Sequence, residues 1–126
     1  MKLLIDTHVL IWWLTEPSWL SSHSQNLLNA DSVEVLVSVV SAYEIEFKRS
    51  ADPLLQRMPE DLIGAVFAEG FDWLDIASED AVTAGRLPRH HRDPWDRLLI
   101  AQGARRGIPI MTRDQAFSAY DVEIVW

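Results

Sequence analysis

The chain of 126 residues contains no cysteine, and its only lysines are Lys2 and Lys48. The absence of cysteine excludes disulfide bonds, thiolate metal ligands and a cysteine nucleophile, and it is compatible with a cytosolic setting. No apolar stretch approaches the ~20 residues that a membrane-spanning helix needs, because Asp6 and His8 interrupt the apolar N-terminus. We therefore expect a soluble, uncleaved, cytoplasmic protein that does not contact a membrane.

Positive charge is also scarce. Lys and Arg together number 11 against 19 Asp and Glu, which gives a formal net charge of −8. A charge of this sign opposes loose binding to phosphate backbones, so a role with nucleic acid requires a bound metal or a local basic rim. The hydrophobic content of 48% is enough for one globular domain, residues 1–126, to bury a core.

Strand and helix signals alternate along the whole chain. Short apolar or β-branched runs predict strands, and segments with apolar residues at helical spacing predict the helices between them. The expected strands are residues 2–5, 33–40, 71–76, 108–111 and 122–125, and the expected helices are residues 7–14, 22–30 (capped by Ser22 or Ser24), 41–50, 60–69, 78–87, 95–106 and a short one within 112–119. This order predicts a three-layer α/β/α fold with a central parallel sheet of four to five strands.

Four acidic residues follow predicted strands on this map. Asp6 ends the first strand, Glu44 lies early in the helix after the second, Asp96 lies in the first turn of a later helix, and Asp114 follows residues 108–111. The carboxyl ends of parallel strands meet at one edge, where open α/β sheets bind ligands. Two carboxylates ~4 Å apart repel by roughly 4 kcal/mol at an effective dielectric near 20, so the set requires protonation or a divalent cation. Oxygen ligands alone favour Mg²⁺ or Mn²⁺.

Three of these acids also have a purely structural interpretation. Ser41-x-x-Glu44 has the spacing of a helix capping box, and Asp93-x-x-Asp96 places two acids where a helix N-terminus favours negative charge. Asp114 has the position of a cap on the last short helix. Asp6 is harder to explain in this way, and the four acids taken together favour a common site.

The segments LLIDTHVLIWW, SAYEIEFK, HHRDPWDRLLIAQGARRGIPIMTRD and YDVEIVW together resemble the PIN-domain ribonucleases, in particular the VapC-type toxins of toxin-antitoxin pairs. The resemblance runs from about residue 2 to residue 126. One departure is Gly103, where similar sequences often have Ala; a glycine inside a helix costs ~1 kcal/mol relative to Ala.

The resemblance implies that Asp6, Glu44, Asp96 and Asp114 are the metal-binding acids, with Thr112 supporting Asp114. Asp93 is an additional acid and ranks second. The implied activity is metal-assisted hydrolysis of RNA, with Mg²⁺ or Mn²⁺ held mainly by Asp6 and Asp96, while the other two acids orient water or hold a second ion. The implied partners are an RNA substrate, a cognate antitoxin whose tail covers the site, and a second copy of the chain.

Basic and aromatic residues near these acids have two interpretations each. Arg86, Arg89, Arg92 and Arg97 cluster in sequence near the proposed site, and of these Arg92 and Arg97 are the RNA contacts that we predict, although a solvated face explains them equally well. His90 and His91 are more typical of a solvated loop than of a metal pair. Trp12 and Trp13 are suited to stack on bases, to contact a partner protein or to pack in the core, and we favour core packing for one of them.

Other classes of protein fit less well. A phosphorelay receiver or aspartyl-phosphate phosphatase needs a lysine late in the chain, and a P-loop needs Gly-x-x-x-x-Gly-Lys; neither is present. The serious alternative is a catalytically inactive binding module that keeps the same fold and acids. Metal-dependent RNA cleavage that is lost in Asp6→Asn separates the enzyme from the module.

Overall fold

The computed structural model describes residues 1–126, and a five-stranded parallel sheet runs through its centre. β1 (Lys2–Ile5) lies between β2 (Glu34–Ser38) and β4 (Ile110–Met111), while β3 (Asp72–Leu74) and β5 (Ile124–Val125) form the two edges. Every neighbouring pair is parallel, so all five strands end at the same edge of the sheet. The predicted parallel sheet is confirmed.

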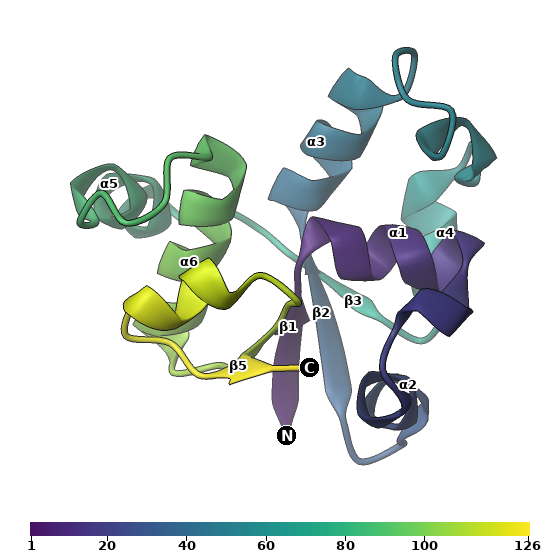
Figure 1. Cartoon of the computed structure of the whole chain (residues 1–126), viewed down its shortest axis with the longest axis horizontal. Helices are drawn as coiled ribbons and strands as arrows, with labels where there is room; N and C mark the ends of the chain where they lie inside the picture. Colours follow the sequence, from purple (N-terminus) through teal and green to yellow (C-terminus); the bar gives the residue numbers. More distant parts are fainter.

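Helices cover both faces of this sheet (Figure 1). α1 (Thr7–Thr15), α2 (Ser22–Asn29) and α4 (Leu62–Ala68) pack on one face together with Leu3 and Ile5 of β1. α6 (Pro94–Arg106) packs on the other face with Leu4, and α5 (Ser78–Arg86) packs on α6. α3 (Val39–Lys48) stands at the carboxyl edge of the sheet. It contributes Ile45 to the hydrophobic core on the side of α1 and Val40 to the core on the side of α6. The three-layer α/β/α architecture is confirmed.

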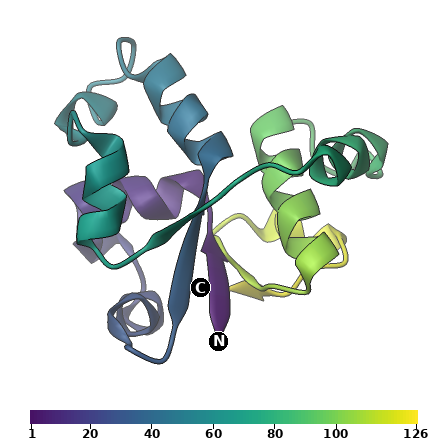
Figure 2. The same ribbon diagram turned by 180° about the vertical axis from the view of Figure 1, so that it is seen from behind.

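The strand order reverses beside β1. The chain builds β2 and then β3 on one side of β1, and later places β4 and β5 on the other side. Figure 2 shows the chain leaving β3 and crossing from the side of α4 to the side of α5. The buried side chain of Gln102 donates from Nε2 to the carbonyl of Asp75 at 3.2 Å and so fixes this crossing. Ligands bind at such a reversal in open α/β sheets, because the loops on either side diverge and leave a crevice.

α6 has the start and end signals that its sequence predicts. The Asp93 side chain accepts the backbone N–H of Trp95 at 2.8 Å, and Pro94 occupies the first turn. Gly107 ends the helix in the left-handed conformation, with φ of 63°. A rigid helix therefore carries Asp96 in its first turn.

One predicted boundary is wrong, and it affects Glu44. The run 33–40 was expected to be a strand followed by a helix opening at Ser41, but β2 ends at Ser38, whose hydroxyl caps α3 by accepting the N–H of Val40 at 3.1 Å. Ser41 is buried, and its hydroxyl hydrogen-bonds that of Thr7 at 2.9 Å. The capping-box interpretation of Glu44 therefore fails, because Ser38 caps the helix and the hydroxyl of Ser41 is used by Thr7.

Other boundaries move by a few residues. Ser21, rather than Ser22 or Ser24, caps α2 by accepting the N–H of Ser24 at 3.0 Å. The edge strands are shorter than predicted, and three short 3₁₀ helices occupy connections: η1 (Pro17–Trp19), η2 (Leu55–Arg57) and η3 (Gln115–Ala119). No helix combines the length and the apolar character that crossing a bilayer requires.

Candidate active site

Asp6 begins the site at the end of the central strand. Its Oδ1 accepts the N–H of Val9 at 2.8 Å, which caps α1, and its Oδ2 accepts the hydroxyl of Thr112 at 2.5 Å. Only 5% of the residue is exposed. Burial raises the pKa of Asp6 above its usual value, although both hydrogen bonds act in the opposite direction. The carboxylate is thus fixed in position and poorly solvated.

Glu44 lies in the second turn of α3 and is also buried. Its Oε2 accepts a 2.6 Å hydrogen bond from Nζ of Lys48, and this bond raises the pKa of Lys48. The other carboxylate oxygen, Oε1, is buried and has no hydrogen-bond partner. An orphaned carboxylate oxygen is costly, so Glu44 is suited to accept from a further cation or donor.

Asp93 and Asp96, both at the start of α6, have different roles. Asp93 accepts the N–H groups of Trp95 and Asp96 and so acts as the helix cap. Asp96 has no capping role, and its pKa is raised to about 7 by burial first and then by the negative charges of Asp93 and Asp6. Asp96 therefore stands among acids that repel it without any paired arginine or lysine of its own.

Asp114 and His91 complete the group. Asp114 caps η3 with Oδ1, while its Oδ2 lies 3.0 Å from Nε2 of His91, and the same nitrogen lies 3.1 Å from Oδ2 of Asp96. Nδ1 of His91 accepts the N–H of Asp93 at 3.2 Å, so in the neutral ring the proton resides on Nε2 and is donated toward the two acids. The predicted solvated loop is wrong for His91, whose side chain is only 14% exposed.

These side chains surround a cleft of about 310 Å³ at the carboxyl edge of the sheet. Its lining consists of Asp6, His8, Trp12, Asp96, Arg113 and Asp114. Glu44 lies behind this lining, close enough for its charge to raise the pKa of both Asp6 and Asp96. The structure thus gathers acids that are up to 108 positions apart in the sequence, from Asp6 to Asp114.

The carboxylates suit a hard divalent cation. One carboxylate oxygen of Asp96 lies within 4.8 Å of one of Asp114, and the free oxygen of Glu44 adds an acceptor without a donor. Carboxylate oxygens are the ligands that Mg²⁺ and Mn²⁺ prefer, and a cation relieves the repulsion that raises the pKa of Asp96. The residues present therefore fit the metal that the sequence implies.

The sequence from residue 3 to residue 123 matches the PIN domain family. It is 30% identical over 119 residues to Ribonuclease VapC22 of Mycobacterium tuberculosis, covering 93% of this chain and 90% of that protein. The chain belongs to the PIN domain family.

Solved structures agree with this PIN fold. VapBC2 from Rickettsia felis, bound to a DNA fragment from its promoter, superposes with a TM-score of 0.74 at 13% identity, covering 99% of this chain and 98% of that one. DNA-bound VapBC from Salmonella typhimurium gives a TM-score of 0.72 at 16% identity, covering 99% and 97%. At these identities the likeness concerns the fold.

Several residues around the acids of this PIN domain were not singled out from sequence. His8 and Arg113 line the cleft, and Lys48 pairs with Glu44. Their positions in the sequence could have indicated them. His8 and Arg113 lie within two residues of Asp6 and Asp114, and Lys48 follows Glu44 by one helical turn. For His91 the signal was weak, since its orientation depends on the fold of the loop before α6.

Arg97 has a different place from the one predicted. Its guanidinium donates to the backbone carbonyls of Pro88 and His91 through one nitrogen, and to those of Ala84 and Leu87 through the other. Because four carbonyls already use its donors, Arg97 holds the loop between α5 and α6, and we do not retain it as an RNA contact. Arg92 is exposed and has no carboxylate partner.

Trp12 and Trp13 both pack against the core of the PIN domain. Trp12 also lines the cleft and meets Trp19 and Trp126 edge to face, with ring centroids 6.3 and 6.0 Å away. Trp13 packs on Phe71. His90 is exposed and meets the ring of Tyr120 edge to face at 5.3 Å, so it does not join His91 at the acids.

Proposed function

We propose that this PIN domain is a Mg²⁺- or Mn²⁺-dependent endoribonuclease that acts as the toxin of a toxin-antitoxin pair. The observation that carries the proposal is the convergence of Asp6, Asp96 and Asp114 around one cleft, with Glu44 close behind it. Burial, with the charges of Asp93, Asp6 and Glu44, raises the pKa of Asp96 to about 7. The relative that is 30% identical is named a ribonuclease, which supports the choice of RNA as substrate.

Asp6, Asp96 and Asp114 would hold the cation at the cleft, with Glu44 behind them. A bound divalent cation supplies a Lewis acid that polarises a phosphoryl oxygen and lowers the pKa of water. Thr112 and the N–H of Val9 orient the Asp6 carboxylate, so that little reorganisation is needed when the substrate binds. No histidine base is required in this scheme.

Other side chains of the cleft would position the phosphodiester. Arg113 and His8 face the same space as the acids, and Nε2 of His91 carries a proton directed at Asp96 and Asp114. Donors beside a group of carboxylates offset their repulsion of a phosphate. Asp93 acts through α6, because its oxygens cap the helix that carries Asp96.

Cleavage of a fluorophore-quencher RNA by the purified protein tests the activity. We expect cleavage with Mg²⁺ or Mn²⁺, none with EDTA, and a loss of at least about 100-fold in Asp96→Asn, because removal of a charge-stabilising group typically costs this much. Asp96 makes no helix cap, so Asn preserves its shape without disturbing α6.

Asp93→Asn is the matched control, with the same loss of one charge three residues away. Asn caps helices as well as Asp does, so this variant should keep most of the activity. Full activity of Asp96→Asn would reject the assigned site. A wild-type protein that binds RNA but never cuts it would favour the inactive binding module instead.

We also propose a cognate antitoxin and a homodimer as partners. Solved structures with this fold include toxin-antitoxin complexes, among them one from Klebsiella pneumoniae, which supports the antitoxin. For the dimer we propose the cluster of Tyr43, Phe47 and Trp95, whose rings contact one another while Tyr43 and Phe47 are 59% and 68% exposed. Aromatic side chains are enriched at the centres of protein interfaces.

Light scattering after gel filtration tests the dimer. Phe47→Glu should give a monomer, because a charge at the centre of a two-fold interface meets its own copy. Val82→Glu, a change at another exposed apolar residue, should leave the mass unchanged. Equal masses for wild type and Phe47→Glu would place the interface elsewhere.

A further inference from the structure

Arginines without an acidic partner are concentrated in one part of this acidic chain. Arg49, Arg57, Arg105 and Arg106 each lie within 4.0 Å of a carboxylate. The arginines with no such partner all lie between residues 86 and 113: Arg86, Arg89, Arg92, Arg97 and Arg113. With 19 acidic residues available, this segregation leaves a local positive region beside the acidic cleft.

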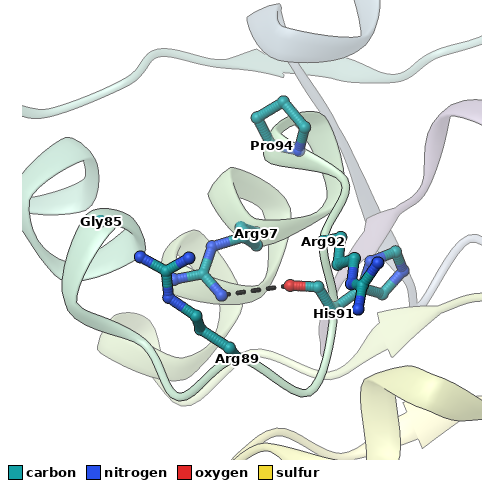
Figure 3. Close-up of a pocket in the computed structure, with 6 residues that line it drawn as sticks. All are labelled: Gly85, Arg89, His91, Arg92, Pro94 and Arg97. Carbon is teal, nitrogen blue, oxygen red and sulfur yellow. Dashed lines mark hydrogen bonds between the residues drawn. The ribbon is translucent and has the colours of Figure 1, made fainter.

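Three of these arginines line one pocket of about 610 Å³ (Figure 3). Its lining contains no hydrophobic side chain and consists of Gly85, Arg89, His91, Arg92, Pro94 and Arg97. Figure 3 shows Arg89 extending from the loop toward Arg97, and Arg92 lying beside His91. Like charges directed at a shared space repel one another, so an anion in that space is stabilised.

Arg97 fixes the shape of this pocket. Its guanidinium ties together the end of α5, the loop at Pro88 and the carbonyl of His91 through four hydrogen bonds of 2.8 to 3.2 Å. Arg97 keeps its positive charge while its donors are used by the backbone. Arg89 and Arg92 are exposed and have free donors, so they are the groups available to a ligand.

The pocket lies one side chain away from the acids. His91 forms part of its lining, and Nε2 of the same residue contacts Asp96 and Asp114 at 3.1 and 3.0 Å. Asp96 and Asp114 in turn line the acidic cleft. The pocket and the acidic cleft are thus linked through His91, which is the arrangement that neighbouring phosphates of one strand require.

We propose that this arginine pocket binds a backbone phosphate of the RNA strand next to the phosphate that is cleaved. The inference rests on the proposed function. The lining contains no hydrophobic side chain, and its one aromatic ring, that of His91, already contacts Asp96 and Asp114. This argues against base stacking and favours contacts to phosphate, which give affinity without sequence preference. Arg89 and Arg92 make the contacts, and Arg97 supports them by holding the loop.

Binding is tested with a short fluorescein-labelled single-stranded RNA of mixed sequence, by anisotropy, in the Asp96→Asn background with Mg²⁺. Arg89→Ala and Arg92→Ala should each weaken binding by about tenfold, because a charge-assisted hydrogen bond is lost. Each should also reduce the slope of log K against log salt by about 0.7. In the active protein, the same changes should raise KM far more than they lower kcat.

Two variants remove the same charge outside the pocket. Arg86→Ala lies at the end of α5, does not line the pocket and has no acidic partner. Lys2→Ala lies at the amino end of β1, at the opposite edge of the sheet. Arg86→Ala should weaken binding clearly less than the pocket variants, because its side chain does not line the pocket. Lys2→Ala should bind RNA within about twofold of the parent, since exposed charges beyond a Debye length of about 8 Å are screened at physiological salt.

The outcomes separate this proposal from the proposed function. If RNA is cleaved in an Asp96-dependent way but Arg89→Ala and Arg92→Ala bind no worse than Arg86→Ala, the pocket assignment is overturned and the nuclease remains. If RNA binding depends on both arginines but nothing is cleaved, the pocket remains and the nuclease fails. If the two variants lose a co-expressed antitoxin but bind RNA normally, the pocket serves a protein partner and our proposal is wrong.

Discussion

Oγ1 of Thr112 donates to Oδ2 of Asp6 across 2.5 Å, joining residues that are 106 positions apart. The two residues follow β1 and β4, the neighbouring strands at which the strand order reverses. The same hydroxyl accepts the backbone N–H of Asp114 at 3.0 Å. One buried side chain thus positions two of the proposed metal-binding acids.

Replacement of Thr112 should therefore affect both acids. In Thr112→Val the N–H of Asp114 and one oxygen of Asp6 lose a partner, which should lower the free energy of unfolding by about 1–3 kcal/mol. The hydrogen bond from Thr112 lowers the pKa of Asp6, so its loss should move the acidic limb of the pH–activity profile to higher pH. Chemical denaturation and RNA cleavage across pH measure the two effects.

Thr112→Ser keeps the hydroxyl and should restore most of the activity and the profile of the wild type. This variant separates the hydrogen bonds from the packing of the methyl group. If Thr112→Val shows an unchanged pH profile while losing stability, the residue supports the fold alone.

Stability in the absence of divalent cations should fall as the pH rises from about 4 to about 7. The pKa of Asp96 is raised from 3.8 to about 7, so in this range the folded protein holds a proton that the unfolded chain releases. Burial changes the pKa of Asp6 in the same direction. The loss attributable to Asp96 is at most about 4 kcal/mol. Urea denaturation in EDTA at a series of pH values measures it.

Asp80 sets the acidic limit of the same curve. Burial alone would raise its pKa, but hydrogen bonds from Arg106, the N–H of Ala77 and Arg105 lower the pKa to about 2. Its contribution to stability is complete above pH 3.8 and is lost as the pH falls toward 2, outside the range of Asp96.

Asp96→Asn should flatten the decline in stability between pH 4 and 7 without affecting the loss of stability at acidic pH. A decline of equal slope in this variant would contradict the assignment to Asp96.

Divalent cations should stabilise the wild-type protein more than Asp6→Asn. A ligand that binds only the folded state stabilises it by about 2.7 kcal/mol at 100 times its Kd. In Asp6→Asn the amide oxygen can still cap α1, so the fold is kept while one anionic ligand is removed. Thermal unfolding with MgCl₂ or MnCl₂, against NaCl of equal ionic strength, gives the shift in Tm.

Asp31→Asn is the matched control for charge, because Asp31 is exposed and precedes β2, at the opposite edge of the sheet from Asp6. Its shift in Tm should equal that of the wild type. Similar shifts in all three proteins would mean that the cations act on the surface in general.

Two helical glycines should respond in opposite ways to alanine. A Cβ at Gly103 would lie 2.8 Å from Cδ1 of the buried Ile110 and 3.1 Å from the carbonyl of Ile108, whereas one at Gly85 meets nothing within 4 Å. Gly103→Ala should thus be destabilising, since overpacking costs about 1–3 kcal/mol against a propensity gain of ~1 kcal/mol. Gly85→Ala should stabilise by up to about 1 kcal/mol. Denaturant unfolding compares them; a more stable Gly103→Ala would show that β4 yields easily.

The sequence predicted the fold where local signals agree with one another. The run before Asp6 is buried as a strand, and Asp93-Pro94 and Gly107 begin and end α6 as expected. The signals conflict at residues 33–40, where β-branched residues continue past the end of β2 into α3. There the choice between strand and helix depends on which face of the molecule is covered, and local propensity does not contain that information.

The candidate site was predicted to a similar extent. The resemblance named Asp6, Glu44, Asp96 and Asp114, and their roles as ligands stay predictions. Neither pattern nor resemblance indicated the orientation of His91 or the use of Arg97 as a support for the loop. Both depend on hydrogen bonds to backbone groups whose positions exist only after α5 and α6 have packed together.

By itself, the order of residues determined which acids follow which strands, because apolar periodicity and helix caps act over a few neighbouring positions. Tertiary structure alone decided that one hydroxyl serves two acids, that Gly103 allows α6 to approach β4, and that the unpaired arginines gather beside the acidic cleft. These relationships join segments distant in sequence, and only the packing of the sheet and its helices fixes the distances between them.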